Sequence, residues 1–378
     1  MKIMILIGLI LFSSYSFANN DLLSLYHDKD YVKKVKEYIK VKKNLNIPIE
    51  IYQKNNPKIV SDLINEYISN HAKSLFHQST LTLLNYRFRK DEIIFTTTAK
   101  YYSQKLQCKG EKLDFDIATV TNFGLRGYFI KIKKNTCEIE KKGSYNTAYY
   151  SVAYDQQSNI LAYAIPGQHK IEIYNKSNFS LLYSIDGYSA TTLEFNNGIL
   201  YFAGYLKGTD WKKSSIYAYN ISDKTIVNQY FNNLLADVRG LSFYNNLMAV
   251  SNGIYNKVYI FDLLKNKTIK TINGLIYPNG NFLIDNDNIL VADEHSNFIR
   301  KINFSKMKEK FHSPTFQLKS PGGVFMITKG KYNQHYLISD TDNNRVILVE
   351  PISWTIIYEI KGLRSCLKAV PIYHKGVK

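Results

Sequence analysis

Five segments in the C-terminal two thirds of the chain repeat one pattern of apolar and polar positions. They read AYYSVAYDQQSNILAYAI, SATTLEFNNGILYFAG, VRGLSFYNNLMAVSN, PNGNFLIDNDNILVADE and PGGVFMITKGKYNQHYLISDT. Each has a start near a small or glycine-containing turn, an apolar run, a polar interruption and a second apolar run. A third and usually a fourth strand-like run follow, as in NRVILVEPISWTIIYEIKG. The pattern predicts repeated units of four short strands.

The spacing of the repeats indicates the architecture. Aligning Ala164, Ala203, Ser251, Asp293 and Asp340 gives separations of 39, 48, 42 and 47 residues. Four-stranded units at a period of about 40–50 residues are typical of β-propeller blades. Such a fold leaves the function open, because propellers host many unrelated activities.

The two ends of this region predict one further blade. DFDIATVTNFGLRGYFIKIKKNTCEIEKKG, from residue 114, has the pattern of the back half of a blade, and CLKAVPIYHKG, from residue 366, has that of a lone first strand. Pairing the two pieces closes the ring and removes its open edges. We therefore expect a mainly β chain, with a six-bladed propeller over residues 113–378 closed by the C-terminal strand.

Residues 19–112 predict a small helical module with added strands. DKDYVKKVKEYIKVKKN has apolar residues at helical spacing and lysines on the other face. That basic face is either a membrane-surface patch or a solvated face. IPIEIY is expected to be an extended connector, and a second helix is expected from Asn56-Pro57, since proline is favoured in the first turn. LTLLNYRFR and DEIIFTTTAKYYSQKLQC are expected to be strands.

The N-terminus predicts export. Lys2 is followed by an apolar core over residues 3–12 and by the small-x-small triplet Ser16-Phe17-Ala18. This three-part pattern is typical of a secretory signal peptide over residues 1–18, and a short buried helix is the alternative interpretation. The apolar core is too short for a membrane span. We expect a periplasmic or secreted protein that begins at Asn19.

The chain is basic, with a formal net charge of +18. After export, the anionic partners available are an envelope protein, a glycan or a lipid surface, and nucleic acid is not expected as a partner. A lysine-rich composition of the proteome as a whole would give the same charge. The three cysteines leave two disulfide alternatives open, Cys108–Cys137 and Cys137–Cys366. An exported protein permits either pair, and the odd count leaves one thiol over.

Two repeats carry a more specific signal: YPNGNFLIDNDNILVADEHSNFIRKIN and SPGGVFMITKGKYNQHYLISDTDNNRVILVE resemble the NHL repeat. The matching residues are Pro278, Gly280, Asp293, Asn297 and Arg300 in one, and Pro321, Gly322, Asp340, Asn343, Asn344 and Arg345 in the other. The earlier repeats are closer to YVTN and WD-like sequences. The resemblance implies a six-bladed NHL-like propeller of an exported bacterial type. It also implies a rival to a binding role, since NHL-like and other six-bladed propellers include lyases and metal-dependent lactonases.

The candidate binding residues of the central channel or its turns are Ser251, Asp293, His295, Asp340 and Arg239. Two of the five aligned channel positions are alanine, which excludes a cage with a ligand from every blade. Asp293 and Asp340 are therefore candidates for at most weak calcium or magnesium binding. No resident cofactor is expected, and no nucleophile with its base is visible. The aspartates also suit an alternative structural role, in which they accept hydrogen bonds from the following turn.

These observations favour a non-catalytic binding or scaffold protein over an enzyme. The expected partner is an envelope protein or an anionic glycan. The alternative is a propeller hydrolase or lyase whose site lies in the central channel.

Overall fold

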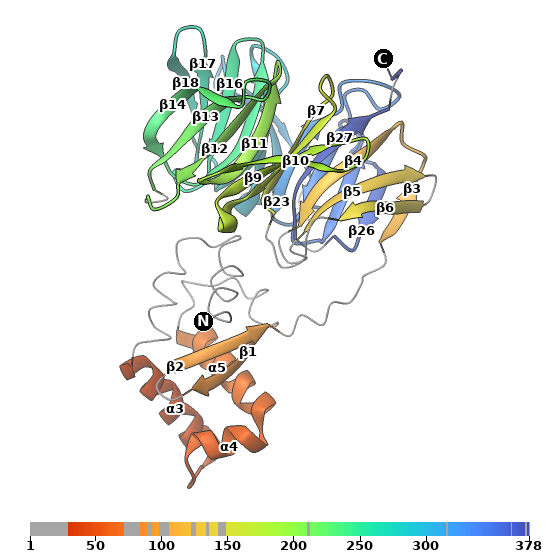
Figure 1. The fold of residues 1–378 in the computed structure, drawn as a ribbon. Coiled ribbons are helices and arrows are strands. Elements are labelled where there is room, and N and C mark those ends of the chain that lie inside the picture. Colours follow the sequence, from red (N-terminus) through yellow and green to blue (C-terminus); the bar gives the residue numbers. More distant parts are fainter. Residues whose placement is uncertain are drawn as a thin grey trace. The chain divides into compact units, whose positions relative to one another are not determined.

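Figure 1 shows the computed structural model of the chain. It describes residues 29–71, 84–89, 92–97, 106–121, 126–133, 136–142, 149–209, 212–314, 317–363, 365–374 and 376–377. The predicted signal peptide lies outside these residues. The chain divides into two compact units, Met1–Gln104 and Lys105–Lys378. The division comes earlier than the sequence-based boundary at residue 113, because a short strand before it belongs to the propeller.

The first unit consists of helices and a hairpin. Its elements are α3 (Lys29–Lys43), α4 (Ile49–Asn55), α5 (Pro57–His71), β1 (Leu84–Arg89) and β2 (Glu92–Thr97). Val35 and Ile39 of α3 and Val60 and Ile64 of α5 are fully buried, as expected for the apolar stripes of two packed helices. The two strands pair antiparallel. The helical module predicted from sequence is therefore present.

The expectation of an extended connector over residues 47–52 was wrong, because residues from Ile49 onward form α4. Pro48 lies just before the helix with φ −55°, and its ring favours that helical value. Ile49 is buried, whereas Ile51 is half exposed. The alternation of IPIEIY over six residues does not separate a strand from a helical turn, and burial of Ile49 decides for the helix.

The second unit is a six-bladed propeller, each blade an antiparallel sheet. From the channel outward, the first four blades along the chain have the following strands. The first and second blades contain β7 (Ser151–Asp155), β8 (Ile160–Ile165), β9 (Lys170–Asn175) and β10 (Leu181–Asp186), and β11 (Tyr188–Asn196), β12 (Ile199–Leu206), β13 (Ser214–Asn220) and β14 (Thr225–Leu235). The third blade contains β15 (Val238–Tyr244), β16 (Leu247–Asn252), β17 (Lys257–Asp262) and β18 (Lys267–Ile272). The fourth blade contains β19 (Pro278–Leu283), β20 (Asn288–Asp293), β21 (Phe298–Asn303) and β22 (Lys308–His312). Short 3₁₀ turns, Pro166–Gln168 and Glu294–Ser296, follow β8 and β20.

The last two blades combine distant parts of the chain. One has β23 (Pro321–Met326), β24 (Tyr336–Asp340), β25 (Arg345–Val349), β26 (Ile356–Lys361) and, at its outer edge, β3 (Gln107–Gly110). The other has β27 (Cys366–Tyr373), β4 (Phe115–Thr121), β5 (Arg126–Lys133) and β6 (Thr136–Lys142). The C-terminal strand thus supplies the innermost strand of a blade built from residues 115–142, which is the closure expected from the split repeat.

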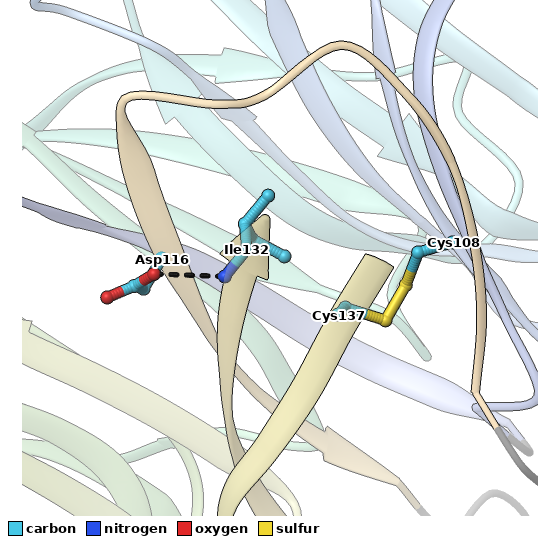
Figure 2. The surroundings of a disulfide bond; sticks show 4 residues. All are labelled: Cys108, Asp116, Ile132 and Cys137. Carbon is cyan, nitrogen blue, oxygen red and sulfur yellow. Dashed lines mark hydrogen bonds between the residues drawn. A yellow bond between two sulfur atoms is a disulfide. The ribbon is translucent and has the colours of Figure 1, made fainter. Parts of the chain in front are cut away.

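A disulfide joins these two blades at their outer strands. Cys108 of β3 is bonded to Cys137 of β6, with Cα atoms 5.8 Å apart (Figure 2). Of the two pairings left open by the sequence, this one is confirmed, and Cys366 is a buried free thiol. Figure 2 also shows the carboxylate of Asp116 accepting a 3.0 Å hydrogen bond from the amide of Ile132. The disulfide therefore fixes the start of the propeller chain to the closing blade.

The openings of five of the six inner strands follow one backbone rule. The residue just before β11, β15, β19, β23 and β27 has φ near +50 to +90°: Gly187, Asp237, Tyr277, Ser320 and Ser365. A β-bulge follows within the first residues of each of these five strands. Bulges turn side chains away from the regular alternation. The inner strands are therefore irregular at the same end, and this end forms one mouth of the channel.

Glycines let the inner strands approach one another around the channel. A Cβ on Gly280 would lie 2.6 Å from the Cα of Gly323, and one on Gly240 would lie 2.6 Å from the carbonyl oxygen of Asn279. Neither distance leaves room for a side chain. The glycines that open the repeat segments are thus required by packing between blades.

Candidate functional site at the channel mouth

The central channel contains a cavity of about 280 Å³ lined by all six inner strands. Its wall is made of glycines, small polar residues and aromatic side chains. The charged residues in the lining are Glu194, Arg239 and Lys368. Arg239 is the bulge residue of β15, the strand that pairs regularly again from Gly240. The bulge places its side chain at the mouth of the channel where the inner strands begin.

Arg239 is held by a buried network, although burial of a single charge would be costly. Its Nε lies 2.7 Å from Oδ1 of Asp237, and the two side chains are only 6% and 2% exposed. Its guanidinium also donates a 2.9 Å hydrogen bond to the hydroxyl of Tyr277 and faces the rings of Tyr150 and Tyr277. Burial alone would lower the pKa of Arg239, but the Asp237 carboxylate holds it well above its ordinary value. The arginine is thus permanently charged and compensated.

Tyr277 links this pair to the surface. Its hydroxyl donates a 2.5 Å hydrogen bond to Oδ2 of Asp237, and its ring stacks on that of His295 at 4.5 Å. Burial raises the pKa of Tyr277 well above its ordinary value, so it stays a neutral donor. His295 is exposed. Two residues singled out from the sequence, Arg239 and His295, are therefore brought together by a tyrosine between them.

Glu294 is the second acid of the mouth. Oε2 accepts a 2.7 Å hydrogen bond from Asn279, and Oε1 accepts one of 3.0 Å from Ser320. Burial raises its pKa to about 6, opposed by the positive charge of Arg239 and by these two hydrogen bonds. We refer to Tyr150, Asp237, Arg239, Tyr277 and Glu294 as the mouth cluster.

A second ion pair crosses the inner strands deeper in the cavity. Nζ of Lys368, on β27, lies 3.0 Å from Oε2 of Glu194, on β11, and donates a 2.6 Å hydrogen bond to the carbonyl of Leu193. β27 and β11 flank β7, which lies between them in the ring. The pair therefore ties three neighbouring inner strands together.

The candidates Asp293 and Asp340 have other partners and do not line the cavity. Both are fully buried, and each ion-pairs at 2.7 Å with an arginine of its own blade, Arg300 and Arg345. The other carboxylate oxygen accepts a hydrogen bond from a backbone amide in the link that precedes the blade. This amide belongs to Ile276 for Asp293 and to Lys319 for Asp340. Both carboxylates are thus committed to fixing the link between blades.

The sequence alignment of the second strands was wrong by one residue. Asp293 and Asp340 pair with the first residues of their inner strands, and so does Asn252 in the blade before them. Ser251 therefore corresponds to the residue before each aspartate. It is fully buried and accepts a 2.7 Å hydrogen bond from Asn281. The apolar run of a second strand does not fix the residue at which the strand ends, whereas the strand pairing does.

The described part of the chain shows neither a metal-binding cluster nor a membrane-spanning helix. No group of three or more His, Cys, Asp or Glu side chains in these residues is arranged to hold a metal ion. None of the helices there has the length and apolar character needed to cross a bilayer.

Comparison with known proteins supports the fold. The WD40 β-propeller domain of Doa1 matches with a TM-score of 0.49 and 13% identity, over 70% of this chain and 85% of that domain. A protein of unknown function from Bacteroides caccae matches with a TM-score of 0.54 and 11% identity, over 69% of this chain and 99% of its own. No family model and no curated protein matches the sequence. At such identities the likeness concerns the fold alone, and the strand pairing of this chain gives the β-propeller.

Sequence reasoning missed most of the mouth cluster. Asp237 and Tyr277 lie 40 residues apart, and both occupy the position just before an inner strand. The available signal was the repeated position itself, where an aspartate and a tyrosine stand in place of the glycine or serine of other blades. Their contact depends on neighbouring blades packing side by side, which the local pattern does not describe.

Proposed function

We propose that this chain is an exported, non-catalytic binding protein whose propeller holds an envelope protein or an anionic glycan. The carrying observation is the state of the charges in the cavity. Arg239 pairs with Asp237, and Lys368 pairs with Glu194, so the charged side chains of the described lining are all ion-paired. Groups held in this way rigidify the ring. A rigid body of this kind presents its surface with little ordering cost on binding.

The test is a complex reconstituted from purified parts. The exported protein, which we expect to begin at Asn19, is used to capture partners from its own cell envelope. The captured component is then purified and titrated against it. The proposal expects saturable binding of unchanged material. A full-length, cytosolic product would remove the export part of the proposal.

The enzyme alternative has its own test. Hydrolysis of lactones and esters is assayed in the presence of calcium or magnesium. The assay compares the unchanged purified chain with the double variant Asp293→Asn with Asp340→Asn. We expect the double variant to be less stable than the unchanged protein, because both carboxylates hold links between blades. We do not expect the substitutions to abolish a specific hydrolytic activity. Metal-dependent hydrolysis that this double substitution abolishes would show that the binding proposal is wrong.

A further inference from the structure

One face of the propeller carries exposed aliphatic residues around the mouth cluster. Strand pairing places the starts of first strands, the ends of second strands and the ends of fourth strands at one edge of each blade. We call this the mouth face. The turns and links at this face expose Leu206, Leu234, Ile254, Tyr255 and Ile276, which belong to two neighbouring blades and the link that follows them. We refer to these five residues as the apolar arc.

The arc is held on fixed backbone. The amide of Ile276 donates to Asp293, and its carbonyl accepts from His295. The turn before Leu234 is held by Ser215, which accepts hydrogen bonds from the amide of Asn233 at 2.8 Å and from Gln229 at 2.9 Å. Solvent-exposed aliphatic side chains on backbone fixed in this way lose little entropy when a partner covers them.

The charges next to the arc favour an acidic partner. Lys207, Lys212 and Lys213 are exposed in the turn after β12, and Lys319 is exposed in the link before β23. On this face Asp293 and Asp340 end second strands, where they are buried and already paired with arginines, and Asp186 at the end of β10 is exposed. The turn after β12 thus presents positive charge beside aliphatic surface. Exposed leucine and isoleucine favour a protein over a polysaccharide, because the apolar side chains of a protein gain from burial against them.

We propose that the apolar arc binds an acidic protein segment with aliphatic anchors. The aliphatic side chains of the segment contact Leu234 and Ile276, and its carboxylates face the lysines of the turn after β12. This rests on the proposed binding function and gives it a surface and a partner chemistry. The mouth cluster fixes the centre of that surface.

The experiment uses the whole mature chain and a labelled peptide in which glutamate and leucine alternate. We expect saturable binding that weakens as salt rises, since exposed charges are screened. Leu234→Ser with Ile276→Ser should weaken binding at least about ten-fold, because two aliphatic contacts are lost. The matched control is Leu264→Ser with Ile352→Ser. These residues are 77% and 91% exposed, against 72% and 52% for Leu234 and Ile276, and lie in turns at the opposite face. The control should bind like the unchanged protein.

Each other outcome decides against the assignment. Equal binding of polyglutamate shows a charge effect only, and preferential binding of polygalacturonate shows a carboxylated glycan site. If the variant on the opposite face loses binding, the binding surface lies on that face. The proposed binding function then still stands. No binding of the glutamate–leucine peptide overturns the surface assignment, whereas a reconstituted envelope complex tests the proposed function separately.

Discussion

Arg239 shows how a single side chain organises the mouth of the channel. It contacts Asp237 in the link before its strand and Tyr277 in the link after its blade. Its guanidinium also faces the ring of Tyr150, just before β7. Charges buried in this way contribute little net stability when complete, but cost several kcal/mol when one partner is removed. The cluster therefore fixes the positions of the links more than it strengthens the fold.

Arg239→Met should lower the free energy of unfolding by about 3 kcal/mol or more, because Asp237 is left buried without its counter-charge. Urea denaturation measures this. Asp237→Asn combined with Arg239→Met should recover most of the loss, and asparagine tolerates the positive φ of 53° at this position. Equal stability of the single and double variants would contradict the ion-pair account.

Glu294 predicts a pH dependence of stability. Its pKa is raised from 4.5 to about 6 in the folded protein, so the folded state binds more protons between these values. Stability from this group is therefore present below about pH 4.5 and is lost as pH rises through 6. The effect is on the order of 2 kcal/mol, since a pKa difference of one corresponds to about 1.4 kcal/mol. Glu294→Gln should remove this component from unfolding curves measured from pH 4.5 to 7, and an unchanged pH slope would refute the assignment.

At the scale of the element, the links between blades are the parts that the polar residues specify. In two consecutive blades an aspartate ending the second strand binds the amide of the preceding link and an arginine within the first three residues of the third strand. The motif residues of the NHL resemblance thus act as structural connectors in this chain. Because the link held by Asp293 presents Ile276, this aspartate also fixes one residue of the apolar arc.

The strand β3 depends on its disulfide. Cys108 and Cys137 are separated by 29 residues, and closing a loop of that size is worth about 3–4 kcal/mol in the chain-entropy model. Cys108→Ser with Cys137→Ser should lower the free energy of unfolding by that amount, measured against the oxidised protein.

Cys366 supplies the internal control for this experiment. It is buried, and burial raises the pKa of its thiol to about 11. We expect no thiol to react at neutral pH in the native protein, one in unfolded oxidised protein and three after reduction. A reactive thiol in the native, oxidised state would show that the closing blade is open.

At the scale of the molecule, ring closure depends on the last strand. β27 pairs with β4 and packs between β23 and β7. Deleting residues 363–378 removes an innermost strand and leaves the edge of β4 unpaired. We expect the whole propeller to lose its cooperative thermal transition. The loss of structure should not be confined to the C-terminus. A truncated protein that melts like the full chain would refute closure as the source of stability.

The sequence by itself determined the blades, the split blade at the two ends and the helical character of the first unit. Apolar and polar periodicity is a local property, so strands such as Ile289–Val291 are visible without knowing their neighbours. Its limits were also local. Short runs such as IPIEIY were ambiguous, and the apolar pattern aligned Ser251 with Asp293, although strand pairing matches Asp293 to Asn252.

Only the tertiary structure decided which polar residues meet. Asp237, Arg239 and Tyr277 come together because successive links pass the same mouth of a closed ring, and the glycines beside them let the inner strands approach. The same holds for Lys368 and Glu194, which are 174 residues apart. Such contacts follow from the packing of blades around a common axis, and no pattern within one blade encodes them.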